Sequence, residues 1–119
     1  MVDNLIKCKE WIEAALAYSG GTHNIDDVFH AILEGRMQLW PTERGSLVTE
    51  ILVYPRKMAL HIFLAGGELD QLTDMHEDVI KWARQQECTA LTLSGRQGWS
   101  KALEKFGWKL QLVHLSKEI

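Results

Sequence analysis

Two long apolar stretches, residues 46–55 (SLVTEILVYP) and 57–66 (KMALHIFLAG), constrain the fold more than any other feature. Both are rich in β-branched and aromatic residues, which favour extended strands. The tight connection at residues 54–57 (YPRK) between them predicts an antiparallel hairpin. Both stretches are more apolar than a sheet with one solvated face requires, so we expect both faces of this sheet to be covered.

The residues before the hairpin have the periodicity of helices instead. Apolar residues recur at helical spacing in residues 3–18, and again in residues 25–33. Asp3 is placed to cap the first of these helices, and Asn24 is a good N-cap for the second. Gly35 suits the left-handed position that follows a helix. The sequence therefore predicts two amphipathic helices ahead of the sheet.

Further elements surround the hairpin, with short connections between them. We expect a strand at residues 37–41, a turn at 42–45, a helix at 68–87, a strand at 88–95, a helix at 99–106 and a strand at 108–116. Strand–helix–strand units imply right-handed crossovers and some parallel pairing, whereas the hairpin adds antiparallel pairing. The predicted order is α-α-β-β-β-α-β-α-β, an α/β fold with a mixed sheet and helices on both faces. A chain of 119 residues fits one domain, residues 1–119.

Composition narrows the classes of function. The net charge of −3 gives no electrostatic argument for nucleic acid, and no run approaches the 18 apolar residues of a membrane span. Cys8 and Cys88 each lie in an apolar pattern, so buried free thiols are expected, with a disulfide left open. The acidic, amphipathic start of the chain is unlike a secretion signal and favours a location inside a cell. Five tryptophans need packing partners, and one could be an exposed anchor for a partner protein.

Few residues are arranged for chemistry. The five histidines show no metal-ligand spacing and the cysteines form no CxxC motif, so no metal site is predicted. The sequence has no P-loop, no GxGxxG and no Gly-x-Ser-x-Gly turn.

The candidate base is a pair formed by Glu50 and His61. If Tyr54 lies opposite Lys57 in the hairpin, then Glu50 lies opposite His61, and side chains directly opposite share one face of a sheet. A carboxylate beside an imidazole could orient it as a catalytic base. A slip of one residue would send the two to opposite faces. The same pair could instead be a satisfied polar contact in an apolar layer.

Two segments carry a resemblance to a known superfamily. They are residues 61–72 (HIFLAGGELDQL), a strand running into a glycine turn and a helix, and residues 101–110 (KALEKFGWKL), a helix, a glycine between aromatics and a strand. With the order of elements, they make the chain resemble the GCN5-related N-acetyltransferases (GNAT). Residues 35–41, 54–57, 63–67 and 95–108 also resemble those of small GNAT-like proteins of tailed phages and prophages.

The resemblance implies a site for acetyl-CoA, whose pyrophosphate would sit at a strand-to-helix turn. The corresponding turn is formed by Leu64, Ala65, Gly66 and Gly67. The basic residue usual in the family is missing there, and Glu68, Asp70 and Asp74 follow instead. The position of the tyrosine that serves many members as a general acid is taken by Leu103. A double glycine at the end of a strand is common in plain turns, so the structural interpretation of this turn is favoured over a pyrophosphate site.

A second candidate binding feature is the glycine-flanked loop at residues 95–98 (GRQG). Arg96 together with Trp99 could bind a phosphate or a base by charge and stacking. Alternatively, Arg96 packs over its neighbour Trp99 without binding anything.

The resemblance therefore favours a phage-type GNAT-fold protein without the usual acetyltransferase catalysis. Its expected role is virion-associated or interaction protein, with phage structural or host proteins as partners, in the host cytoplasm or in the phage particle. The alternative is an acetyl-CoA-dependent N-acyltransferase acting on a small amine, a protein N-terminus or a lysine. Acetyl-CoA is the one cofactor that this alternative implies. A small regulator that binds host protein or nucleic acid is a third hypothesis, and the acidic balance disfavours nucleic acid.

Overall fold

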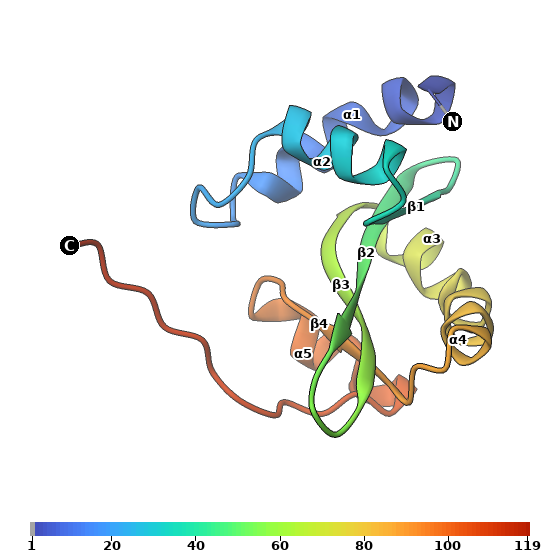
Figure 1. The fold of residues 1–119 in the computed structure, drawn as a ribbon, viewed down its shortest axis with the longest axis vertical. Coiled ribbons are helices and arrows are strands. Elements are labelled where there is room, and N and C mark those ends of the chain that lie inside the picture. The colour runs from blue at the N-terminus through green and yellow to red at the C-terminus, as the bar shows by residue number, and fades with distance from the viewer. Residues whose placement is uncertain (1) are drawn as a thin grey trace.

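The computed structural model describes residues 2–119 as helices around a four-stranded sheet (Figure 1). The elements are α1 (Val2–Leu16), α2 (Ile25–Leu33), β1 (Gln38–Pro41), β2 (Gly45–Val53), β3 (Met58–Gly67), α3 (Leu69–Asp74), α4 (His76–Gln85), β4 (Ala90–Leu93), α5 (Gly98–Ala102) and a 3-10 helix (Glu104–Phe106).

The sheet has the strand order β1-β2-β3-β4. β1 pairs antiparallel with β2, and β2 pairs antiparallel with β3, as the two apolar stretches predict. The Tyr54 N–H donates to the carbonyl oxygen of Lys57 at 2.8 Å and closes the hairpin. β3 pairs in parallel with β4, which makes the sheet mixed.

Helices pack on both faces of the sheet, and each face has its own apolar core. On one face α1 and α2 bury a core that includes Cys8, Ile12, Val28, Val48 and Leu64. On the other face α3 and α4 bury a second core that includes Leu60, Ile62, Leu72, Val79 and Ala83. Figure 1 shows α1 and α2 together, away from α3 and α4. The prediction that both faces are covered is confirmed where these helices lie.

The capping predictions have mixed outcomes. The Asp27 N–H donates to the side chain of Asn24, and the Asn24 N–H donates to the Asp27 carboxylate, both at 2.9 Å. This reciprocal pair is a capping box at the start of α2. Gly35 has a φ of 80°, as expected after the helix. The prediction that Asp3 caps α1 is wrong, because Asp3 lies inside the first turn of that helix.

The single helix expected at residues 68–87 is also wrong. It consists of α3 and α4, separated at Met75. The first half contributes Leu72 to the core and the second contributes Val79 and Ala83. A break at Met75 lets α3 and α4 each follow the twisted surface of the sheet. Helical periodicity in the sequence does not reveal where such a break is needed.

The strand expected at residues 108–116 is absent. Residues 107–119 form no helix or strand, and in Figure 1 this tail runs away from the rest of the protein. An alternating pattern favours an extended chain, but a strand also needs a partner for its backbone groups. Within residues 2–119 no strand pairs with this tail, so the order of elements ends after the 3-10 helix.

The tryptophans are all half-buried. Trp11 packs against the core under α1, and the others pack against the second core. Trp40 meets Trp82 edge-on, and the Trp108 indole N–H donates to His76 Nε2 at 3.0 Å. The expected exposed tryptophan anchor is therefore not found. Cys8 and Cys88 are free and buried, which confirms the expectation of free thiols.

Candidate functional site

The predicted register between β2 and β3 is confirmed at the candidate base. Glu50 lies opposite His61, and the pairs from Thr49–Ile62 to Val53–Met58 follow the same register. The register shifts between Val48 and Thr49, beyond this region. Leu60 and Ile62 on either side of His61 enter the second core, so His61 points to the opposite face.

The partners of His61 differ from the expected one. Its Nδ1 lies 2.8 Å from the Thr92 hydroxyl, and its Nε2 lies 3.0 Å from the Ser94 hydroxyl. Both hydroxyls come from β4 and the residue that follows it. Among residues 2–119, His61 and Glu50 form no hydrogen bond or ion pair with each other. The hydrogen-bonded Glu–His pair is thus replaced by a Thr–His–Ser arrangement, with Glu50 as a charged neighbour.

Electrostatics favour a neutral imidazole at His61. Burial lowers its pKa below the ordinary value of 6.5, and the negative charge of Glu50 acts in the opposite direction. A neutral imidazole has one N–H donor and one acceptor nitrogen. The ring N–H therefore donates to one hydroxyl, and the other ring nitrogen accepts a hydrogen bond from the second hydroxyl. A neutral imidazole beside the exposed Ser94 is a candidate base for a group bound there.

The cluster lies where two parallel strands separate. β3 pairs with β4 through Ala59–Ala90 to Ile62–Leu93, and the Ser94 N–H adds a bond of 3.1 Å to the Ile62 carbonyl. β3 then continues to Gly67, whereas β4 has ended. Thr92 and Ser94 were not predicted as partners of His61. They are distant from His61 in the sequence, and only the pairing of β4 with β3 brings them close to it.

The candidate pyrophosphate turn is packed against other parts of the protein. A Cβ added at Gly66 would overlap the carbonyl oxygen of Trp11 in α1. One added at Gly67 would overlap the Arg44 carbonyl oxygen and the Gly45 Cα, and Gly67 has a φ of 105°. These glycines are explained by close backbone approach, with no open cradle beside them.

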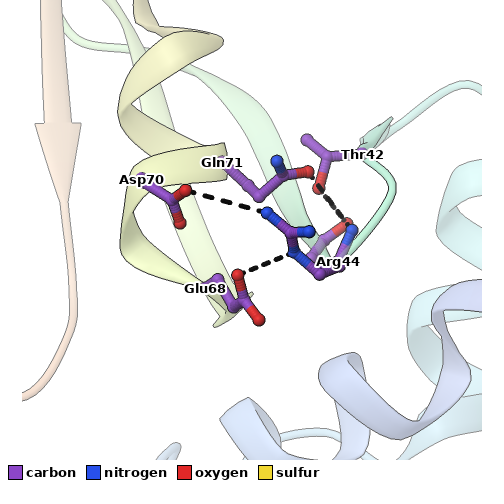
Figure 2. Close-up of polar contacts among 6 residues, drawn as sticks. Thr42, Arg44, Glu68, Asp70 and Gln71 are labelled. Carbon is purple, nitrogen blue, oxygen red and sulfur yellow. Dashed lines mark hydrogen bonds and ion pairs between the residues drawn. The ribbon is translucent and has the colours of Figure 1, made fainter.

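An ion-pair network closes the start of α3 (Figure 2). The Arg44 side chain donates to the Glu68 carboxylate at 2.7 Å and lies 3.8 Å from the Asp70 carboxylate. The Glu68 N–H donates to the Arg44 carbonyl oxygen at 2.9 Å, and the Arg44 N–H donates to Gln71 Oε1 at 3.3 Å. Thr42 and Gly45 hold the turn that carries Arg44.

The residues of this turn therefore do not fit a pyrophosphate group. Two carboxylates would repel its charge, and the Glu68 N–H that would meet it is already bonded. Arg44, the one cation in the network, is engaged by the carboxylates. Leu103, which the resemblance predicts to lie where many acetyltransferases have a tyrosine, is buried and has no group to donate.

The loop at residues 95–98 is arranged differently from the expectation. The Arg96 guanidinium lies over the ring of Tyr18, 4.7 Å from its centroid, and Tyr18 follows α1. Trp99 packs against the second core, and a Cβ at Gly95 would lie 3.0 Å from its ring. The structure therefore stacks Arg96 on Tyr18 and uses Trp99 for packing. A phosphate or base site formed by Arg96 and Trp99 stays a prediction.

The surface hollows, the metal-ligating side chains and the helices were the remaining features that could indicate a binding site or a membrane span. Two shallow hollows of about 550 and 400 Å³ lie along α4 and between β1, α3 and α4, and neither is lined by His61, Thr92 or Ser94. Residues 2–119 contain no cluster of three or more His, Cys, Asp or Glu side chains that could hold a metal. Within that same range, no helix has the length and apolarity required to cross a bilayer.

Comparison with solved structures identifies the architecture. An acetyltransferase of Trypanosoma brucei superposes with a TM-score of 0.68 at 12% identity, covering 98% of this chain and 94% of that one. An aminoglycoside acetyltransferase from an uncultured soil sample, in complex with sisomicin, has a TM-score of 0.68 at 11% identity, covering 98% and 91%. This chain has a GNAT-like fold.

Another neighbour with this GNAT-like fold is a Thermus thermophilus protein, with a TM-score of 0.68 at 13% identity, covering 100% of this chain and 92% of that one. No protein-family model matches the sequence, and the comparison with curated proteins finds no significant match. At identities this low the likeness establishes the fold alone. The phage-like relation is not shown by any of these comparisons.

Proposed function

We propose that this chain is a GNAT-fold binding protein that has lost the usual acetyl-CoA-dependent catalysis and acts through contacts with other proteins. The observation that carries this proposal is the closed turn between β3 and α3. There, the Arg44 side chain and the Glu68 and Asp70 carboxylates form their own ion-pair network (Figure 2).

Both the charge of this turn and the lack of space around it disfavour a bound pyrophosphate. Backbone N–H groups at a helix start attract an anion only if they are free and no fixed negative charge competes. Here the Glu68 carboxylate stands at the start of α3 and its N–H is bonded to Arg44. Trp11 and Arg44 backbone atoms fill the space beside Gly66 and Gly67. A pyrophosphate would have to displace the network and approach two carboxylates.

The proposal also includes the partners of this protein and the place where it acts. The resemblance of residues 35–41, 63–67 and 95–108 to small tailed-phage proteins supports a role among phage structural or host proteins. It supports a location in the host cytoplasm or in a phage particle.

The proposal is tested by thermal unfolding of the protein with and without 1 mM acetyl-CoA. We expect no change in Tm, because two carboxylates flank the turn and the Glu68 N–H is already bonded. An acetyltransferase of the same fold serves as the positive control. A ligand present at about 100 times its Kd adds about 2.7 kcal/mol to the free energy of unfolding. A clear rise in Tm for this protein, retained in repeated titrations, would contradict the proposal.

A second candidate function, N-acyl transfer to an amine, is favoured by the His61 site. A neutral imidazole held by two hydroxyls where β3 and β4 separate can accept a proton. Acetylation of an amine by the wild-type protein that is lost in His61→Gln would establish this candidate. The thermal measurement and this assay together separate the two functions.

A further inference from the structure

Ser94 is an exposed serine held against the half-buried His61. Its hydroxyl oxygen lies 3.0 Å from His61 Nε2, and its N–H donates to the Ile62 carbonyl oxygen at 3.1 Å. The backbone bond fixes Ser94 beside β3, so the hydroxyl and the imidazole meet on one face of the sheet. Nucleophilic serines lie within hydrogen-bond reach of their base, about 2.6–3.2 Å, and Ser94 meets this requirement.

The other ring nitrogen of His61 is held by Thr92. Its Nδ1 lies 2.8 Å from the Thr92 hydroxyl oxygen. A neutral imidazole carries its proton on one nitrogen only. With the proton on Nδ1, the ring donates to Thr92 and Nε2 accepts from Ser94. In this tautomer Thr92 orients the ring, the task that a carboxylate performs in a Ser–His–Asp triad.

Two opposing influences set the charge of the imidazole. Burial lowers the pKa of His61, which keeps Nε2 available as an acceptor near neutral pH. Glu50, opposite His61 on β2, carries a negative charge that favours the imidazolium once the ring has taken a proton. The ring is therefore neutral before a reaction and is stabilised by its neighbour when it becomes charged.

The loop after Ser94 supplies donors for a developing negative charge. Ser94 leads from β4 into α5, and a strand-to-helix connection also carries the nucleophilic serine of many hydrolases. Within residues 2–119, the N–H groups of Gly95, Arg96 and Gln97 donate to no partner. The N–H that directly follows such a serine commonly stabilises the oxyanion of the tetrahedral intermediate.

We propose that Ser94 is a catalytic nucleophile that takes the acyl group of a small activated ester, with His61 as its base. Ser94 Oγ forms a bond to the acyl carbon while His61 Nε2 takes the hydroxyl proton. The bond to the leaving oxygen then breaks with its electron pair, and that oxygen receives the proton from the imidazolium.

Water completes the cycle. It attacks the acyl carbon and gives a proton to His61 Nε2, and Ser94 Oγ leaves with the electron pair and takes that proton back. The products are a carboxylic acid and an alcohol.

The surroundings of Ser94 favour a small substrate. Neither of the two hollows described above is lined by Ser94 or His61, and a long acyl chain would need a deeper pocket. This activity goes beyond the proposed binding role and uses no acetyl-CoA. Its test therefore fails or succeeds independently of the thermal measurement with acetyl-CoA.

The first experiment treats the folded full chain with a fluorophosphonate, whose phosphorus bonds to an activated serine oxygen as fluoride leaves. Peptide mass spectrometry locates the label, which we expect on Ser94. Labelling should slow by about 10²–10⁴-fold in His61→Gln, the range of a general base. Ser100→Ala, which removes an exposed serine of α5 whose hydroxyl donates to the Gln97 carbonyl oxygen, is the matched control and should label at the wild-type rate.

The second experiment follows hydrolysis of p-nitrophenyl acetate. We expect an initial burst of p-nitrophenol as Ser94 is acetylated, and no burst in Ser94→Ala. An unlabelled Ser94, equal labelling rates in the wild type and His61→Gln, or a burst that persists in Ser94→Ala overturns the proposal. Circular dichroism shows that each variant is folded.

Thr92 is a positioning residue in this scheme. Thr92→Val removes the hydroxyl while keeping a branched side chain, and it should slow the labelling of Ser94. Thr92→Ser retains the hydroxyl and should restore most of the rate. Equal rates in the valine and serine variants would show that Thr92 does not orient His61, which overturns the arrangement on which the proposal depends.

Discussion

Single residues in this protein owe their identity to close packing more than to chemistry. Gly66 and Gly67 lie in the turn predicted from the resemblance as a cofactor site, yet backbone atoms of Trp11, Arg44 and Gly45 occupy the space around them. Leu103 is buried at the position where a tyrosine would be wanted. The sequence marked Gly66, Gly67 and Leu103 as positions to test for a functional site. The structure explains each of them by packing.

Gly66→Ala should destabilise the protein, because the new Cβ would overlap the Trp11 carbonyl oxygen and α1 would have to move. We expect a loss of about 1–3 kcal/mol in the free energy of unfolding, measured by chemical denaturation. Gly98→Ala is the matched control, since a Cβ there meets nothing within 4 Å. Equal stability of the two variants would show that α1 does not pack on the turn as described.

His61 should make stability depend on pH. Its folded-state pKa is lowered by burial, so the unfolded chain binds a proton more readily as the pH falls through 6.5. Stability is therefore fully present above this value and is lost as the pH falls toward the folded pKa. We expect His61→Gln to show a smaller fall in Tm between pH 7.5 and 5.5 than the wild type.

The control for this measurement is His114→Gln in the exposed tail, which should keep the pH dependence of the wild type. If His61→Gln and the wild type lose Tm in parallel, burial does not disfavour the charged imidazole, and the proton-transfer interpretation of the Thr92–His61–Ser94 arrangement fails.

Helices and strands followed local signals closely where a cap or a turn was present. α2 is bounded by the Asn24 capping box and by Gly35, and the hairpin by the turn after Tyr54. The break at Met75 has no such signal, because it serves the packing of α3 and α4 on a twisted sheet.

Asn24→Ala should weaken α2 by removing the side chain that accepts from the Asp27 N–H. We expect a loss of about 1 kcal/mol in the free energy of unfolding, measured by urea denaturation. Asn24→Ser retains a side-chain oxygen at this position and should restore most of the loss. Failure of serine to do so would mean that the capping bond does not stabilise the helix.

The sheet of the whole molecule has two edges, because β1 pairs only with β2 and β4 only with β3. The C-terminal tail forms no strand at either edge, and its apolar side chains are exposed. The structural neighbours show how the same architecture can be retained at identities of 11–13%. The packing of helices on the sheet therefore determines the fold. The chemistry of a protein with this fold depends on the individual residues of its site.

The sequence by itself determined the two N-terminal helices, the hairpin and its register, and the placement of Glu50 opposite His61. These depend on periodicity, caps and turn length, which act over a few residues. Only the tertiary structure decided that Thr92 and Ser94 hold His61, that Arg44 closes the turn before α3, and that the alternating tail finds no partner strand in its own chain. Each of these depends on contacts between residues distant in sequence, and no local pattern encodes which distant groups will meet.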